Sequence, residues 1–192
     1  METISTLTGR FALIASLTLL PVAMIAQTNS MSASSSNGNV SSSDRKFVHE
    51  AAQGGMAEVE LGKLATEKAS SPEVKKFGQR MVDDHSKVNE QLKEVANSQG
   101  ISLPSKLSAK DEMTKERLSK LSGEQFDKAY MSDMVKDHTQ DVADFQQEAT
   151  SASDPAVKEF AEKTLSVLKS HLREAKQIAP TTTASASKMQ GS

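Results

Sequence analysis

Cysteine is absent from this 192-residue chain, so the protein can form neither a disulfide nor a thiolate metal site. The same absence excludes the lipid-modified cysteine of a bacterial lipoprotein. Tryptophan is also absent and aromatic residues make up only 4% of the chain, so a folded core must consist of Leu, Val, Ala, Met and a few Phe. The formal net charge is −2 and no long basic run occurs, which argues against a nucleic-acid partner.

The first residues differ from the rest of the chain. A short segment with one basic residue, Arg10, precedes the apolar run FALIASLTLLPVAMIA, which ends at Ala26. This order predicts a signal peptide over residues 1–26. The run is short for a membrane span, but Met24 departs from the small-residue rule at the −3 position, so cleavage after Ala26 and an uncleaved anchor both stay open. No later segment is apolar enough to cross a membrane, and we expect an exported protein of the periplasm or cell envelope of a bacterium.

Two low-complexity segments border the part of the chain that can fold. Residues 27–43 are rich in Ser, Asn and Gly, and we expect a disordered spacer. Residues 180–192 have a similar composition and predict a disordered tail. The folded domain is therefore expected over residues 44–179.

Start and stop signals divide this domain into four long helices and one short helix. Asp44 is expected to cap a first helix, Ser71 and Pro72 begin a second, and Gly100 ends it. A short amphipathic helix is expected over Ser108–Leu121. Ser122 and Gln125 then form a capping-box pair at the start of the third long helix. The long helices are predicted over residues 44–69, 72–99, 124–150 and 155–179, with Pro180 as the final stop.

Each long helix has an apolar stripe with steps of three and four residues, the spacing of a helical bundle. Short connections make the first two helices antiparallel neighbours, and likewise the last two. The long crossover with its short helix predicts an all-α, ferritin-like four-helix bundle. A weak internal repeat relates residues 81–86 (MVDDHS) to residues 134–139 (MVKDHT).

Four motifs in order carry a likeness to a known family: AAQGGMAEVELGKLA (51–65), RMVDDH (80–85), FDKAYMSDMVKDH (126–138) and LSVLKSHLREA (165–175). The chain resembles the secreted bacterial family catalogued as domain of unknown function 4142, often labelled as outer-membrane proteins. The resemblance implies a ferritin-like bundle that is exported from the cytoplasm, and it implies no established activity. It also implies that the family's typical polar positions are occupied here by Glu58, His85, His138 and His171.

One ionisable residue interrupts the apolar stripe of each long helix, namely Glu58, His85, His138 or His171. Burial of such groups is costly unless a partner satisfies them. Their similar depth predicts a shared layer, in which three imidazoles and a carboxylate would suit one zinc or copper ion. Asp141 is a further candidate ligand or an acceptor behind His138.

The competing interpretation is a polar network, in which Glu58 accepts a hydrogen bond from a histidine and fixes the register of the bundle. Sequence alone gives the two interpretations equal weight. Diiron chemistry is disfavoured, because no Glu-x-x-His motif precedes any of these histidines. Met81 and Met134 each precede a histidine by four residues, which would favour copper, but packing in the core is the simpler interpretation.

The sequence therefore favours an exported binding protein that holds a metal ion without turnover. A structural or stress-related envelope protein with a hydrogen-bonded core is the alternative. A metalloenzyme is a third class that the sequence supports less, because no nucleophile–base pair or phosphate-binding loop occurs.

Overall fold

The structure is a computed structural model that describes residues 40–189, with side chains described up to residue 179. The predicted signal peptide (residues 1–26) and residues 27–39 of the predicted spacer lie outside the described residues.

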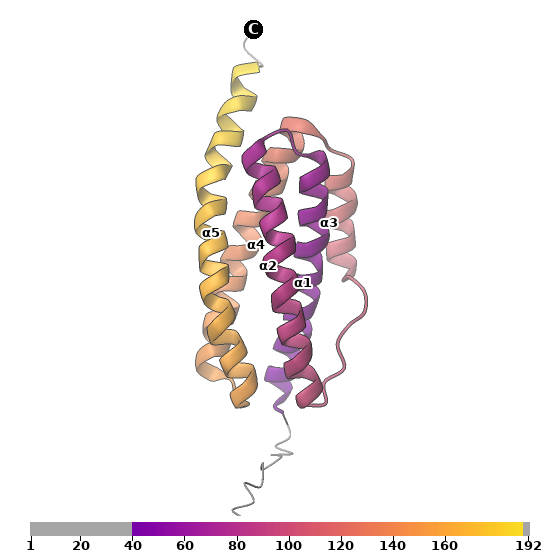
Figure 1. Cartoon of the computed structure of the whole chain (residues 1–192), viewed down its shortest axis with the longest axis vertical. Helices are drawn as coiled ribbons and strands as arrows, with labels where there is room; N and C mark the ends of the chain where they lie inside the picture. The colour runs from indigo at the N-terminus through magenta and orange to yellow at the C-terminus, as the bar shows by residue number, and fades with distance from the viewer. Residues whose placement is uncertain (1–39, 190–192) are drawn as a thin grey trace, which may run out of the picture. The chain divides into compact units, whose positions relative to one another are not determined.

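Five helices make up the described part of the chain, and four of them are long and pack as a bundle (Figure 1). The helices are α1 (Ser42–Lys68), α2 (Pro72–Ser98), α3 (Ala109–Ser119), α4 (Gly123–Ser151) and α5 (Pro155–Met189). The short helix α3 lies in the crossover between α2 and α4 and packs against α1. This arrangement confirms the predicted all-α bundle with one long crossover. Within the described range, no helix is both long and apolar enough to span a membrane.

The described helices extend beyond both ends of the predicted domain. Val40 is buried and Ser41 is the N-cap of α1, because its Oγ accepts a hydrogen bond from the Asp44 backbone N–H at 3.0 Å. The folded region thus begins inside the predicted spacer, and Asp44 is not the cap. At the other end, α5 continues past Pro180 to Met189. A proline removes one backbone hydrogen bond and kinks a helix, but it does not have to end it.

Buried aspartates lock the two short turns of the bundle. Asp44 accepts hydrogen bonds from the backbone N–H groups of Ser153 (3.1 Å) and Asp154 (2.8 Å), between α4 and α5. Asp127 accepts from the N–H groups of Ser70 (3.1 Å) and Ser71 (2.9 Å), between α1 and α2. Each aspartate lies near the start of one hairpin and holds the turn of the other hairpin, so the two helix pairs are tied together at both ends.

These matching contacts reveal an internal repeat. At one constant offset, SSPEV (70–74) aligns with SDPAV (153–157), Asp44 with Asp127, and Phe77 with Phe160. The repeat unit is therefore a helical hairpin, with α1–α2 matching α4–α5. The weaker similarity between residues 81–86 and 134–139 relates α2 to α4 and does not correspond to this structural repeat.

The remaining helix ends are set locally. Ser71, Ser108 and Asp154 accept hydrogen bonds from backbone N–H groups of the turns that they start, as their sequence context predicts. Gly100 has φ +63° after α2, a conformation that favours glycine and ends the helix. The predicted capping box of Ser122 is wrong, because the Ser122 side chain makes no capping hydrogen bond.

Glycine allows α1 and α2 to approach closely. A Cβ atom at Gly62 would lie 2.7 Å from the Gly78 carbonyl oxygen, and one at Gly78 would lie 2.6 Å from the Ala65 Cβ. A Cβ atom at Gly54 would meet nothing within 4 Å. The close contact between the first two helices therefore depends on Gly62 and Gly78.

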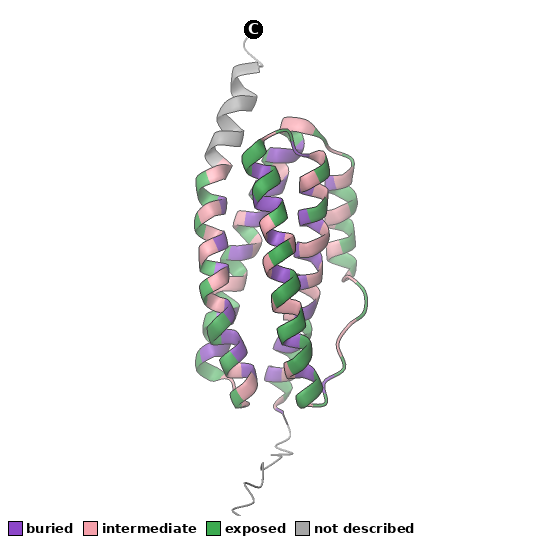
Figure 2. Cartoon of the chain, in the orientation of Figure 1, coloured by how far each residue is buried: buried purple, intermediate pink, exposed green. Residues whose placement is uncertain are grey.

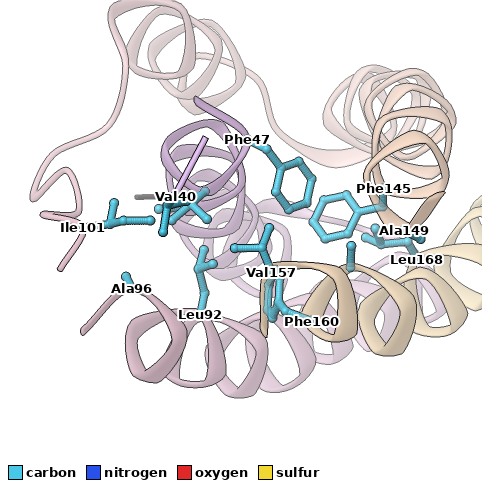
Figure 3. Packing of buried hydrophobic residues seen from close by; sticks show 13 residues of the cluster. Val40, Phe47, Leu92, Ala96, Ile101, Phe145, Ala149, Val157, Phe160 and Leu168 are labelled. Atoms are coloured by element: carbon cyan, nitrogen blue, oxygen red, sulfur yellow. The ribbon is translucent and has the colours of Figure 1, made fainter. Parts of the chain in front are cut away.

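The buried faces of the four long helices point inward (Figure 2) and form two separate hydrophobic clusters. The first, shown in Figure 3, surrounds the Phe47–Phe145 contact, whose ring centroids are 4.8 Å apart. The second contains Phe77, Phe126 and Tyr130. All four long helices contribute to both clusters, and on each helix the predicted polar residue stands between the two contributions. The core is thus divided by a polar layer.

Candidate metal centre

His85 of α2, His138 of α4 and His171 of α5 meet in this polar layer. The ring centroids are 5.7 Å apart for His85 and His138, and 5.3 Å apart for the other two pairs. All three side chains are buried. One ring nitrogen from each histidine lies within 4.8 Å of the others, close enough for a single metal ion to be bound by all three.

Hydrogen bonds fix the tautomers of two of these imidazoles. His138 Nδ1 lies 3.0 Å from the Met134 carbonyl oxygen, which can only accept, so the proton of a neutral ring is on Nδ1. His171 Nε2 lies 2.9 Å from Asp84 Oδ2, which places its proton on Nε2 in the same way. The other nitrogens, His138 Nε2 and His171 Nδ1, then carry lone pairs. Both are buried and have no hydrogen-bond partner among the described residues.

His85 completes this set, because its Nε2 is also buried without a hydrogen-bond partner in the described range. Two nitrogens that both carry lone pairs cannot bond to each other, so His138 and His171 cannot satisfy one another, and a cation would satisfy both. Metal-bound histidines typically donate their second N–H to a carboxylate or a backbone carbonyl, as His171 and His138 do here.

The predicted polar network around Glu58 is not formed. Glu58 Oε1 lies 3.9 Å from His138 Nδ1, beyond hydrogen-bond distance, and Glu58 Oε2 is buried without a partner among the described residues. The hydroxyl of Tyr130 is likewise buried and unpartnered within the described residues.

Glu58 and Asp141 belong to a second group. One ligand atom each from Glu58, Asp141 and His138 lie within 4.8 Å of one another, and His138 is the residue that the two groups share. The four residues predicted from the stripes therefore lie in one layer but not around one point. The three histidines lie around one point, and Glu58 lies instead beside Asp141.

Burial keeps the three histidines neutral. It lowers the pKa of His85 well below the ordinary value, and the neighbouring His138 and His171 lower that pKa further. Burial also lowers the pKa of His138, to about 4. The pKa of His171 is lowered by burial, although its hydrogen bond to Asp84 opposes the shift. Neutral imidazoles have the lone pairs that a metal ion needs.

The carboxylates show the opposite shift. Burial raises the pKa of Glu58 well above its ordinary value, and the nearby charge of Asp141 adds to the effect. Burial raises the pKa of Asp141 to about 7, and Asp137 contributes through repulsion. Both groups are therefore costly to ionise in the absence of a cation.

A network behind His171 was only partly visible in the sequence. Asp84 directly precedes His85 on α2, and its carboxylate reaches across to His171 on α5. Arg80, which the sequence analysis missed, donates from Nε to Asp84 (3.2 Å), from Nη2 to Ser170 (3.0 Å) and from Nη1 to Glu174. The i, i+4 spacing of Arg80 and Asp84 was the available signal. This network holds the carboxylate that orients His171.

Met81 and Met134, which could have been copper ligands, are packed in the hydrophobic core. Met81 and Met134 are fully buried members of the second hydrophobic cluster. Their place in this cluster supports the packing interpretation and leaves imidazole as the ligand type of the centre.

Comparisons with known proteins give the fold and a family without an activity. A family model described as "Domain of unknown function (DUF4142)" matches residues 29–178, which include all four motifs of the resemblance. A crystal structure of a DUF305 fragment from Deinococcus radiodurans is similar with a TM-score of 0.65 and 16% sequence identity. The similarity covers 73% of this chain and 97% of the fragment, and it supports the bundle fold alone. No curated protein matches.

Proposed function

The chain belongs to the DUF4142 family, whose description assigns no activity, and we propose that this member binds one metal ion, without turnover, at His85, His138 and His171. The observation that supports the proposal is the convergence of three buried imidazoles, each of which has a ring nitrogen without a hydrogen-bond partner among the described residues. Burying such groups without a partner is costly, and a bound cation would offset that cost.

Imidazole ligands suit zinc and copper, and these are the ions that we propose. Three histidines supply three of the four positions of a tetrahedral zinc ion. Glu58 lies in the other group, so the fourth position falls to solvent or to a small ligand. The Asp84 carboxylate and the Met134 carbonyl would orient two of the rings from behind.

The alternative, a structural or stress-related envelope protein with a hydrogen-bonded core, has less support. Its expected hydrogen bond from a histidine to Glu58 is replaced by a 3.9 Å separation. We further propose that the protein acts outside the cytoplasm, in the periplasm or cell envelope. This part of the proposal depends on the signal-like composition of residues 1–26.

Elemental analysis of untagged protein that has been exported in its own compartment tests the binding proposal. We expect about one zinc or copper ion per chain, and none in a His85→Ala/His138→Ala variant that still gives the circular dichroism of a helical bundle. His49 is the matched control, because it is an exposed histidine on α1. His49→Ala should keep the full metal content.

Two outcomes would contradict the proposal. The native protein would contain no metal and bind none when zinc or copper is added, while the variant melts at a markedly lower temperature, as a purely structural core predicts. Alternatively, the double variant would retain the metal content of the native protein, which would place the ion elsewhere.

A further inference from the structure

A cleft opens beside the second group of ligand atoms. It has a volume of about 330 Å³ and is bordered by α1, α3 and α4. Its lining contains five acidic residues, namely Glu58, Asp111, Asp133, Asp137 and Asp141. Glu58 and Asp141 occupy matching positions of the two repeated hairpins, and they are the pair of carboxylates that meets next to His138.

Glu58 distinguishes this cleft from an ordinary acidic surface. Its side chain lines the cleft, yet the residue is only 4% exposed and its Oε2 has no hydrogen-bond partner among the described residues. A buried carboxylate normally has a hydrogen-bond donor or a cation beside it. Here the second carboxylate of the pair, Asp141, adds repulsion instead.

Basic side chains of the described region compensate this pair only in part, because the charge of Lys110 lowers the pKa of Asp141 but burial and the charge of Asp137 outweigh it. Lys110 and Lys136 also line the cleft, but neither forms an ion pair with Glu58 or Asp141 in the part of the chain that the structure describes. Arg117 is bound to Asp133 at the border of the cleft. Glu58 and Asp141, the innermost carboxyl groups of the cleft, therefore have no close Lys or Arg partner among the described residues, and a cation from solution would fill that role.

We propose that Glu58 and Asp141 form a second cation site, which takes a hard divalent ion such as Mn²⁺ through carboxylate oxygens and water from the cleft. Carboxylate and water ligands suit Mn²⁺, Mg²⁺ and Ca²⁺, whereas the three imidazoles suit zinc or copper. The two groups of ligand atoms share only His138, and neither Glu58 nor Asp141 belongs to the three-histidine centre, so the carboxylate site can be tested apart from the proposed function.

Manganese binding to the metal-free full chain, measured by electron paramagnetic resonance of free Mn²⁺ in the presence of one equivalent of zinc, tests the site. We expect the native chain to take up one Mn²⁺ ion. Glu58→Gln/Asp141→Asn should bind Mn²⁺ at least about tenfold more weakly and keep its zinc, which also reports that the bundle is folded. The single variant Glu58→Gln provides a second, milder test in the same direction.

Glu162→Gln is the matched control, because Glu162 is an exposed acid on α5 that does not line the acidic cleft. It should leave the Mn²⁺ affinity of the native chain unchanged. His85→Ala/His171→Ala should lose zinc and retain Mn²⁺.

Three results would overturn the inference: no Mn²⁺ uptake by the native chain at about 1 mM, equal uptake by the Glu58→Gln/Asp141→Asn variant, or Mn²⁺ loss only in the histidine variant. Zinc binding without Mn²⁺ uptake would refute this site and leave the proposed function intact. Mn²⁺ uptake through Glu58 and Asp141 without zinc binding would support this site and refute the proposed function.

Discussion

At the scale of single residues, the polar layer contains groups whose protonation responds to pH in opposite directions. The pKa values of the three buried histidines are lowered in the folded state, and those of Glu58 and Asp141 are raised. The two sets therefore contribute opposite slopes to the stability of the metal-free protein, and substitutions can separate them.

Acidification should weaken the metal-free protein through its histidines. Unfolded histidines take up protons near pH 6.5, whereas folded His138 stays neutral down to about pH 4. The unfolded state thus binds more protons in this window, and the free energy of unfolding falls as the pH falls. For His138 alone the loss amounts to roughly 3 kcal/mol. The loss is measured by urea denaturation between pH 7 and pH 4 of the Glu58→Gln/Asp141→Asn variant, which lacks the two carboxylates with the opposite pH response. A free energy of unfolding that does not change over this range would contradict the lowered pKa values.

The double variant Glu58→Gln/Asp141→Asn also tests the raised pKa values of the two carboxyl groups, at neutral to alkaline pH. Because the folded state holds protons on Glu58 and Asp141 more tightly than the unfolded state does, these carboxylates cost stability as the pH rises to about 7 and above. Without a divalent ion, Glu58→Gln/Asp141→Asn should be more stable than the native protein at pH 8, and its advantage should shrink towards pH 4. Thermal unfolding of both proteins with a chelator present measures the difference. A variant that is less stable at pH 8 would show that the two carboxylates are satisfied in the native fold.

Asp84 should act on metal affinity through His171. Asp84→Asn removes the carboxylate that fixes the ring through Nε2, and such changes typically weaken metal binding by about 10–100-fold. Competition with a zinc-binding dye measures the affinity. Asp83→Asn is the control, because Asp83 is exposed and contacts Gln79 on the same helix. Equal affinities for the two variants would show that Asp84 does not orient a ligand.

At the scale of helices, the two hairpins are held internally by close packing and to each other by the buried aspartates Asp44 and Asp127. Between α1 and α2, the glycines Gly62 and Gly78 allow a close approach of the two helices. Because the helix positions are set at these contacts, they also set the depth at which the polar residues meet.

The glycines of α1 allow a matched test of this packing. Gly62→Ala would place a Cβ atom 2.7 Å from the Gly78 carbonyl oxygen, and we expect it to lower the free energy of unfolding by about 1–3 kcal/mol. Gly54→Ala has open space around its Cβ atom and should raise the free energy of unfolding by about 0.5–1 kcal/mol through helix propensity. Chemical denaturation of both variants measures the pair. Equal effects would show that α1 and α2 can separate without cost.

At the scale of the whole described bundle, the three-histidine centre links the two hairpins. His85 comes from the first hairpin, and His138 and His171 come from the second. A metal ion bound only by the folded state therefore opposes the separation of the hairpins and stabilises the bundle.

Zinc should accordingly raise the stability of the folded protein. At a free concentration about 100 times the dissociation constant, one bound ion adds about 2.7 kcal/mol to the free energy of unfolding. Thermal or urea unfolding with and without zinc measures the gain, and His85→Ala should abolish it. An unchanged transition at saturating zinc would mean that the ion binds the unfolded chain as well as the native bundle, or does not bind.

Local patterns explain why most of the fold could be predicted. The predicted long helices agree with α1, α2 and α4 to within about two residues, because apolar periodicity and the signals at Ser71, Gly100 and Asp154 act over a few neighbouring residues. The predictions failed where distant groups compete for the same side chain. Aspartate is a favoured residue type at N-caps, but the Asp44 carboxylate instead accepts hydrogen bonds from the backbone N–H groups of Ser153 and Asp154. Residue spacing cannot reveal that contact.

The sequence by itself determined the helices, their antiparallel pairing and the depth of the polar layer, because a fixed rise and a fixed number of residues per turn place Glu58 and the histidines at one level. Only the tertiary structure decided how that layer is divided. The rotation of each helix about its axis, set by packing around Gly62 and by the two hydrophobic clusters, brings three imidazole nitrogens together and pairs Glu58 with Asp141. These rotations depend on contacts between distant segments, and a periodic pattern along one helix does not contain them.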